Sequence, residues 1–301
     1  MAAEGAKKNH ILITGGRGFI GGYLANHLNK SGFKVTTISR GTIDNERHLC
    51  ADLTNEDKTL DLAKRLPPVD TIIHCAAIAH GEKPPGDYSV ADFNTLIVEN
   101  IIKAFAENDP HWIFMSSISV YGDFHSELSI PITREPKPID SYGIGKLRDE
   151  RLFISNCHNI DILRLMPVYA KNNLRDIRKR VFIPYTNFKI SLRPAPLYSI
   201  CSLDKVLTAI EGCMKRKPSQ RIIQVGDPLP VSQADFLAWF AGRPIPVPQL
   251  ILRFIVFILP KRFSFLREIS FMIKKFGLNN IYDIGSIDLT KNRCQSNKFE
   301  N

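Results

Sequence analysis

The stretch ILITGGRGFIGG, residues 11–22, joins an apolar run to a glycine-rich turn. The apolar run ends at Thr14, and glycines follow at a spacing of three, at Gly15, Gly18 and Gly21. Glycine lets the chain turn sharply and lets its backbone approach a ligand closely. The free N–H groups at the start of the following helix favour a pyrophosphate. The stretch therefore predicts a strand, a dinucleotide-binding turn and a helix. The alternative is a tight turn that binds nothing.

Strand-like and helix-like segments alternate along the first 170 residues. Apolar and β-branched runs predict strands, and apolar residues at helical spacing predict helices. The expected strands lie within residues 34–40, 70–77, 112–117 and 160–165, and the expected helices are 93–108 and 141–157. Such alternation implies a parallel sheet with helices on both faces. The predicted fold class is therefore α/β, a Rossmann-type doubly wound parallel sheet.

Prolines cluster after Tyr169 and mark turns around shorter elements. We therefore expect residues 1–170 to form the dinucleotide-binding domain. Residues 171–290 are expected to form a smaller substrate-binding region that is interleaved with it, and residues 291–301 a polar tail.

The formal net charge of +10 at pH 7 is unevenly distributed. Residues 1–170 contain 18 Lys and Arg against 21 Asp and Glu, whereas residues 171–301 contain 22 against 9. Nucleic acid, an anionic membrane surface and an acidic small substrate each suit a basic excess. Nucleic acid ranks last, because no nucleic-acid-binding motif is present.

The six cysteines are scattered and form no C-x-x-C pair, so we expect reduced thiols in a cytoplasmic protein. The polar, lysine-bearing start of the chain does not have the pattern of a signal peptide. The spacing of His and Cys residues predicts no metal site.

Ser117, Tyr142 and Lys146 are the candidate catalytic residues. Tyr142 and Lys146 are four positions apart, so they share one face of a helix. The lysine ammonium is expected to favour the phenolate and to lower the tyrosine pKa from its usual value near 10. The pair could then exchange a proton with an alcohol or a forming alkoxide. Ser117 ends a predicted strand, at the edge where open α/β sheets bind ligands, and could orient the same oxygen.

In this order, the motifs resemble those of the extended short-chain dehydrogenases/reductases, also called the NAD-dependent epimerase/dehydratase family. Specific motifs cover residues 11–169, and a looser similarity extends to about Asp288. The matching segments are residues 14–21, 74–77, 116–122, 142–146 and 163–169. The resemblance implies a Rossmann-type domain, bound NAD(P) and a nucleotide-sugar substrate.

The resemblance also implies individual contacts. Asp52 is similar to the acid that holds the adenine ring, and Asn94 matches an asparagine that opens the following helix. The implied cofactor contacts are Gly15, Arg17, Gly18, Phe19, Ile20, Gly21, Asp52, Leu53, Ala76, Ala77, Asn94 and Pro167, and the implied substrate contacts are Ser119 and Tyr169.

The chain departs from the family pattern at several positions. Gly145 replaces a serine before the catalytic lysine, and Ala170-Lys171 replaces Gly-Pro. Ser199 to Leu203 replaces a His-Val-Asp-Asp-Leu stretch. Ile118-Ser119 replaces the Asp-Glu of the dehydratases, and neither residue can act as a general acid, so dehydration is not expected.

The second predicted strand ends in Ser39-Arg40-Gly41, without the carboxylate that NAD-preferring enzymes place there. An arginine suits a 2′-phosphate, and Arg17 could add a second cation. We therefore predict NADP(H), with NAD as the alternative. Arg40 could instead point to solvent.

The predicted reaction is reduction of a nucleotide-linked 4-keto sugar. Tyr142 would give the proton, Lys146 would tune Tyr142, and Ser117 would steady the oxygen. A 4-epimerase with tightly bound NAD is the alternative. A non-catalytic NAD(P)-binding sensor or scaffold is a further one, because fold alone does not fix function.

Two features of the basic region, residues 171–301, bear on which molecules it could bind. Arg193 follows a predicted strand and could hold the pyrophosphate of the substrate, or it could be a solvated surface residue. The apolar run 250–259 is about half the length needed to span a bilayer, so a buried helix is predicted, and a helix lying on an anionic membrane surface is the alternative. A homodimer and a weak peripheral membrane contact are left open.

Overall fold

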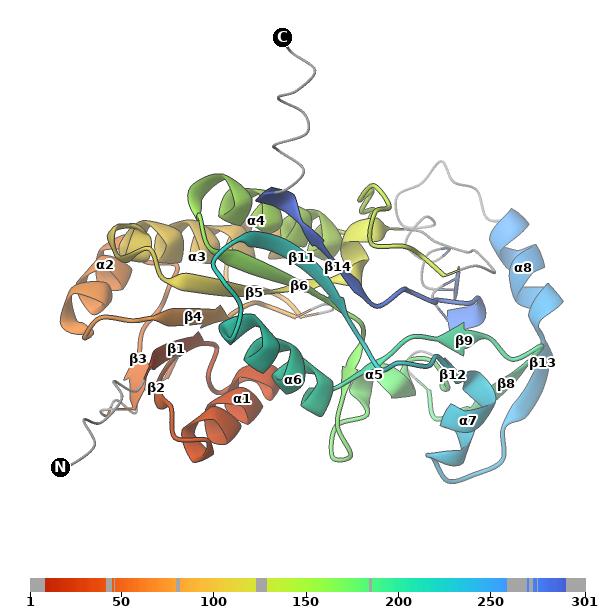
Figure 1. Cartoon of the computed structure of the whole chain (residues 1–301). Helices are drawn as coiled ribbons and strands as arrows, with labels where there is room; N and C mark the ends of the chain where they lie inside the picture. The colour runs from red at the N-terminus through yellow and green to blue at the C-terminus, as the bar shows by residue number, and fades with distance from the viewer. Residues whose placement is uncertain are drawn as a thin grey trace, which may run out of the picture.

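An eight-stranded, mainly parallel sheet forms the centre of the structure (Figure 1). The computed structural model describes residues 9–41, 45, 47–79, 82–122, 129–183, 186–258, 270, 273–274 and 276–290. The strands are β1 (His10–Thr14), β2 (Lys34–Ser39), β3 (His48–Cys50), β4 (Thr71–His74), β5 (His111–Ser117), β6 (Ile160–Leu165), β11 (Gln220–Val225) and β14 (Gly285–Asp288). Their order is β14-β11-β6-β5-β4-β1-β2-β3, and β14 is antiparallel to its neighbour.

Helices cover both faces of the sheet (Figure 1). Leu24 and Leu28 of α1 (Phe19–Lys30) and Ile210 of α6 (Leu203–Met214) share one core with Ile11 and Ile13 of β1. Leu12 points to the opposite core, which is formed with α2 (Glu56–Arg65), α3 (Val90–Phe105) and α4 (Ser141–Asn156). Continuous apolar strands such as β1 are typical of a parallel sheet buried on both faces. The predicted α/β, doubly wound fold class is confirmed.

Some element boundaries differ from the prediction. The helix expected over 93–108 begins at Val90, because the Ser89 side chain accepts a hydrogen bond from Asp92 N at 3.0 Å. Its last turn is a separate 3₁₀ helix, Ala106–Asn108. Strands β11 and β14 come from residues 171–290 and yet join the central sheet, so the two predicted regions share one sheet.

Smaller elements lie beyond the end of the sheet where β6 ends (Figure 1). Several of them contribute to a third core that includes Ile177, Tyr198 and Phe236. The strand pairs are β7 (Val168–Tyr169) with β10 (Cys201–Ser202), β8 (Ile190–Arg193) with β13 (Ile245–Pro248), and β9 (Leu197–Tyr198) with β12 (Val231–Ser232); the helices are α5 (Arg175–Arg178), α7 (Gln233–Ala238) and α8 (Gln249–Ile258). The predicted tail 291–301 lies outside the described residues.

The prediction of a buried helix over 250–259 is wrong. Helix α8 forms, but the side chains of Leu250, Phe254 and Phe257 are 74%, 61% and 83% exposed. The helix contacts β13 and the chain near Gly277, where the Gln249 side chain donates a hydrogen bond to the Gly277 carbonyl. These contacts cover one side of the helix and leave the other side exposed.

A buried ion pair joins α4 to the sheet. The guanidinium of Arg164 on β6 donates two hydrogen bonds to the Glu150 carboxylate, at 3.0 and 2.7 Å, and one to the Tyr121 hydroxyl at 2.8 Å. The Ser116 hydroxyl also donates to Glu150, at 2.5 Å. Because both charges are buried, each depends on the other for its hydrogen bonds.

We expect Arg164→Met to lower the free energy of unfolding by about 3–5 kcal/mol, because Glu150 would be left charged and unpaired. Urea denaturation measures the loss. The control is Lys103→Met, which breaks the exposed pair with Glu56 and should cost below about 1 kcal/mol. The double variant Arg164→Met/Glu150→Leu should lose less free energy of unfolding than Arg164→Met, because it leaves no unpaired charge. Equal losses for Arg164→Met and Lys103→Met would contradict the assigned role of the pair.

Candidate functional site

The winding of the sheet changes direction between β1 and β4. The chain runs outward from β1 to β2 and β3 on one side, and from β4 to β5 and β6 on the other. Open α/β sheets bind ligands at the carboxyl ends of the strands at such a point. The candidate site therefore begins where β1 and β4 end, at Thr14 and His74.

The turn after β1 and the loop after β4 are in contact. Gly15 has a φ of +71°, and a Cβ on it would lie 2.8 Å from Ala76 N. A Cβ on Gly21, in the first turn of α1, would lie 2.4 Å from the Gly15 carbonyl oxygen. Only glycine fits these two positions, and the close packing holds the start of α1 against the switch point.

The amino terminus of α1 is open to an anion. Its N-cap residue, Gly18, provides no capping side chain, and the first turn contains no acidic residue. In contrast, side chains of Asn55 and Ser89 cap α2 and α3. The first N–H groups of α1 and its dipole are therefore available to a phosphate, so the residues present fit a dinucleotide.

The loop after β4 is held by two polar side chains. The Thr14 hydroxyl oxygen accepts a hydrogen bond from Ala76 N at 3.1 Å, and it lies 2.9 Å from His74 Nδ1. The Asn94 amide accepts from Ile78 N at 2.7 Å and donates to the Ile78 carbonyl at 3.1 Å. Asn94 was expected to open a helix, but it lies buried in the second turn of α3. Its side chain shapes the loop that carries Ala76 and the exposed Ala77.

His74 is neutral in this setting. Burial and the nearby Lys146 lower the pKa of His74 to about 3. Within the described residues, its Nε2 atom is buried and has no hydrogen-bond partner. An uncharged imidazole therefore lies beneath the switch point.

Two arginines flank the end of β2. A Cβ on Gly41 would lie 2.4 Å from the Arg17 Nη1 atom, so the Arg17 side chain passes directly beside this turn. The Arg40 guanidinium carbon lies 5.9 Å from the centre of the Phe93 ring. Both arginine side chains are exposed.

The residues expected near an adenine ring also have structural contacts. Asp52 is exposed and accepts hydrogen bonds from the Thr54 backbone N–H and hydroxyl, at 3.1 and 2.7 Å. Leu53 is buried, and its carbonyl accepts from the Asn100 side chain at 2.9 Å. Both residues follow β3, at the same end of the sheet as Gly15.

Two glycines of α4 allow close packing around Tyr142. A Cβ on Gly143 would lie 2.5 Å from the Ser119 carbonyl oxygen, and a Cβ on Gly145 would lie 2.9 Å from the Ala91 Cα atom of α3. The second contact explains why glycine stands where the family pattern has serine. The first holds the start of α4 against the 3₁₀ helix η2 (Ile118–Tyr121).

Lys146 is anchored to the sheet. It is only 4% exposed, and its Nζ donates a hydrogen bond to the Met115 carbonyl of β5 at 2.8 Å. Its Nζ lies 4.6 Å from the centre of the Phe114 ring and 5.9 Å from that of Tyr142. Burial lowers the pKa of Lys146, although Asp149 and other neighbours oppose this.

The expected lowering of the Tyr142 pKa is wrong for this arrangement. Burial raises the pKa of Tyr142, and the negative charges of Asp140, Asp176 and Asp149 raise it further. Lys146 lies over the ring and is hydrogen-bonded to β5, so its charge does not offset these effects. The Tyr142 phenol therefore holds its proton at neutral pH.

Ser117 lies where expected, at the carboxyl end of β5. Its hydroxyl oxygen accepts a hydrogen bond from Ser119 N at 3.1 Å and caps η2. Because Gly143 packs against Ser119, the serine turn and the start of α4 are neighbours. The structure thus gathers the segments that carry Ser117, Ser119, Tyr142 and Lys146.

Tyr169 is committed to a structural bond. Its hydroxyl donates to the Asp227 carboxylate at 2.9 Å, and the other carboxylate oxygen accepts from the Ser202 N–H and hydroxyl. Burial and Asp227 raise the pKa of Tyr169 to about 12. Pro167 precedes β7, and its carbonyl accepts a hydrogen bond from Cys201 N at 3.0 Å.

Arg193 is exposed at the end of β8, where its Cα pairs with that of Pro248, one residue before α8. Among the described residues, the charges that raise the pKa of Tyr142 are those of Asp140, Asp176 and Asp149, which lie on other segments than Arg193. A different arginine, Arg180, was not predicted as a site residue.

Arg180 follows α5 and lies close to the candidate site. Its guanidinium carbon is 5.4 Å from the centre of the Tyr198 ring, and its Nη1 donates to the Asp176 carbonyl at 2.5 Å. Its buried Nε has no hydrogen-bond partner among the described residues, and burial lowers the pKa of Arg180. The Asp176 side chain in turn acts on Tyr142. In the sequence, Arg180 ends the basic run Arg178-Lys179-Arg180, which resembles a solvated surface.

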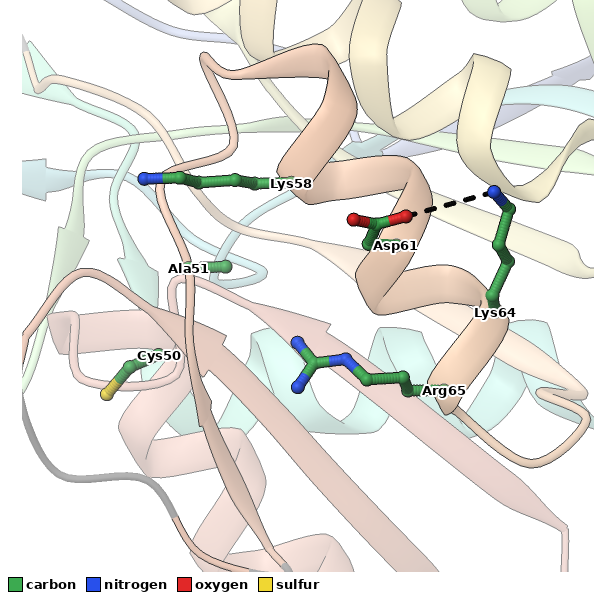
Figure 2. Close-up of a pocket in the computed structure, with 6 residues that line it drawn as sticks. All are labelled: Cys50, Ala51, Lys58, Asp61, Lys64 and Arg65. Carbon is green, nitrogen blue, oxygen red and sulfur yellow. Dashed lines mark ion pairs between the residues drawn. The ribbon is translucent and has the colours of Figure 1, made fainter.

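A basic hollow of about 440 Å³ lies elsewhere, between the end of β3 and α2. Figure 2 shows Lys58 and Arg65 extending from α2 toward Ala51 and Cys50, while Lys64 pairs with Asp61 at 3.8 Å. None of these residues belongs to the predicted catalytic set, so the hollow is not the candidate site.

Comparison with known proteins identifies the family to which the chain belongs. A model of the NAD dependent epimerase/dehydratase family matches residues 11–196. The uncharacterized UDP-glucose epimerase YtcB of Bacillus subtilis is 26% identical over 230 residues, which is 68% of this chain and 70% of that protein. The CDP-abequose synthase of Salmonella typhimurium is 25% identical over 277 residues, 82% of this chain and 85% of that protein. Two other curated relatives are matched over only 45% of their length.

Among solved structures, the Bordetella bronchiseptica enzyme WbmH in complex with NAD⁺ has a similar fold. Its TM-score is 0.65 at 16% sequence identity, covering 80% of this chain and 86% of WbmH. The family match spans more than half of the chain and includes the glycine turn, the serine turn and the Tyr142–Lys146 pair. The chain therefore belongs to the NAD dependent epimerase/dehydratase family of enzymes.

Proposed function

We propose that this chain reduces the 4-keto group of a nucleotide-linked sugar, with a nicotinamide dinucleotide as cofactor. The observation that carries this proposal is geometric: the start of α4, which carries Tyr142, packs against the serine turn through Gly143, and Lys146 is anchored beside it on β5. A tyrosine in this position could give its proton to a forming alkoxide, which is the proton transfer that reduction of a keto group requires. The names of two relatives, an epimerase of UDP-glucose and a CDP-abequose synthase, support a nucleotide sugar as substrate.

The cofactor would be held along the carboxyl ends of β1, β2 and β4. The turn from Gly15 to Gly21 and the start of α1 would bind its pyrophosphate, including the N–H groups of Phe19 and Ile20. The remaining proposed contacts come from Asp52, Leu53, Ala76, Ala77, Asn94 and Pro167. When bound, this cofactor supplies the hydride for the keto carbon.

The residues of the chain would manage the oxygen of the substrate. The Ser117 hydroxyl would donate a hydrogen bond to the keto oxygen, and Tyr142 would give that oxygen its proton. Lys146, anchored on β5, would keep a positive charge below the phenol as negative charge forms there. Ser119 would contact the sugar, and Tyr169 would do so through its ring, since its hydroxyl is hydrogen-bonded to Asp227.

We expect Tyr142→Phe to lower kcat for a UDP- or CDP-linked 4-keto sugar by about 100-fold or more, because proton transfer contributes that much to such reactions. The Kd for the cofactor, measured by fluorescence quenching, should stay level. The control is Tyr88→Phe, which removes the hydroxyl of an exposed tyrosine with no assigned role. Near wild-type turnover in Tyr142→Phe would remove Tyr142 from the mechanism.

Preference for NADP(H) is supported by Arg17 and Arg40. Both cations flank the end of β2, and Ser39-Arg40-Gly41 contains no carboxylate to bind a ribose 2′-hydroxyl. A second candidate function, 4-epimerisation with tightly held NAD, is favoured by the epimerase relatives and by the family description. A sensor or scaffold role is not favoured, since both Tyr142 and Lys146 are present.

The nucleotide released from the purified, denatured protein separates these functions. A reductase must exchange its cofactor in each turnover, so we expect little bound nucleotide and saturable binding of added NADPH. Mass spectrometry identifies what is released. One NAD released per chain, with epimerisation and no net reduction, would replace the reductase by the epimerase.

The diphosphate of the substrate has two proposed partners, Arg193 and Arg180. Arg180 has the geometric advantage, because it is half-buried, has an unpartnered Nε, and lies near the Asp176 that acts on Tyr142. An arginine can bind two phosphate oxygens at once.

We expect Arg180→Ala to raise the KM for the nucleotide sugar by at least about tenfold, which corresponds to about 1.4 kcal/mol. The KM for the cofactor should not change, and Arg180→Lys should recover part of the affinity. Arg193→Ala is the matched exposed variant. If only Arg193→Ala raises the KM for the sugar, the phosphate contact belongs to β8 and not to Arg180.

A further inference from the structure

Helix α8 has an apolar face that the described part of the chain does not cover. Leu250, Phe254 and Phe257 are spaced four and three positions apart, so they form one stripe along the helix. Ile251 borders the stripe and is 50% exposed. Four large apolar side chains on one face of a ten-residue helix form a contiguous patch, unlike scattered surface residues.

The inner side of α8 is fixed to the protein. Gln249 is buried and hydrogen-bonded to the Gly277 carbonyl, and a Cβ on Gly277 would lie 2.7 Å from the Leu252 Cδ1 atom. The strand before the helix, β13, is paired with β8 over four residues. The apolar stripe is therefore presented by a helix that is already folded and anchored.

The sequence around α8 is strongly basic. Residues 236–267 contain five Lys and Arg and no Asp or Glu; the basic residues are Arg243, Arg253, Lys261, Arg262 and Arg267. Of these, only the Arg243 side chain is described, and it is exposed; the Arg253 side chain and residues 261, 262 and 267 lie outside what the structure describes. Apolar residues on one face and a surplus of cations favour an anionic lipid surface. A second copy of the same chain is disfavoured, because two such surfaces would bring like charges together.

The length of the helix limits how it can meet a membrane. At about 1.5 Å per residue, a ten-residue helix is about 15 Å long, half of a bilayer core. Within the described residues, no helix combines the length and the apolar character needed to cross a membrane. The helix would therefore lie in the plane of the interface.

We propose that α8 docks the protein on an anionic phospholipid bilayer, with Leu250, Ile251, Phe254 and Phe257 inserted among the lipids, and that the basic surplus of the surrounding sequence favours the anionic headgroups. This inference is independent of the proposed reaction. It assigns a role to the basic excess of residues 171–301 other than binding of substrate phosphate.

Flotation of the full-length protein with lipid vesicles tests the proposal. The protein should bind vesicles of phosphatidylcholine mixed with phosphatidylglycerol and should not bind vesicles of phosphatidylcholine alone. Added salt should weaken binding, because surface charges are screened. Phe254→Ser/Phe257→Ser should weaken the partition by at least about tenfold, because burial of apolar groups drives insertion. Failure to bind the mixed vesicles, or binding by the double variant at wild-type strength, would overturn it.

A matched pair of single variants provides the control. Ile251→Ser removes an isoleucine that is 50% exposed on α8, and Ile284→Ser removes one that is 52% exposed beside β14. Only Ile251→Ser should weaken vesicle binding. Thermal unfolding should be unchanged in all variants, because the replaced side chains are exposed. Analytical ultracentrifugation tests whether a second copy of the chain binds this face instead. A wild-type dimer that becomes a monomer in Phe254→Ser/Phe257→Ser, without vesicle binding, would assign the face to a second copy.

Discussion

The site depends on how closely backbone segments approach one another at the carboxyl end of the sheet. At Gly15, even a methyl group would collide with the loop after β4, and at Gly143 it would collide with the serine turn. These contacts leave no room for side chains between the segments. The glycine turn, the loop at Ala76 and the start of α4 therefore have fixed relative positions before any ligand binds. Such preorganisation lets a few hydrogen bonds orient a substrate without further ordering of the chain.

Burial dominates the electrostatics of the catalytic pair. From spacing alone, a lysine four residues after a tyrosine should stabilise the phenolate. In the folded chain, removal from water raises the pKa of Tyr142 and lowers the pKa of Lys146, and three aspartates act in the same direction on the tyrosine. The same two residues therefore favour a proton donor in this arrangement. The surroundings that raise the pKa of Tyr142 are not contained in the motif.

Much of the fold could be predicted because apolar strands and helix starts are local signals. The runs Ile11–Ile13 and Ile72–Ile73 are buried on both faces, as their composition indicates. Strand β11 gave no such signal, since Gln220, Arg221 and Gln224 are buried within it. Their partners come from distant segments: Arg221 is paired with Asp161 at 2.5 Å, and Gln220 donates to the carbonyls of Ile154 and Cys157. Polar residues that tertiary contacts bury in a strand look like a loop in the sequence.

The site residues divide in the same way, into those with a local sequence signal and those that depend on tertiary contacts. Ser117, Tyr142 and Lys146 could be named because their order and spacing belong to a motif. Arg180 could not, because an arginine in a basic run is solvated by default, and its burial depends on Tyr198 and Asp176. For the run 250–259 the error was the reverse: burial was predicted, and the structure shows exposed side chains. Apolar composition measures the free energy gained when a helix leaves water, but it does not say which surface provides the contact. Among the described residues, the protein itself covers only one side of α8, so several residues that predicted a core are exposed.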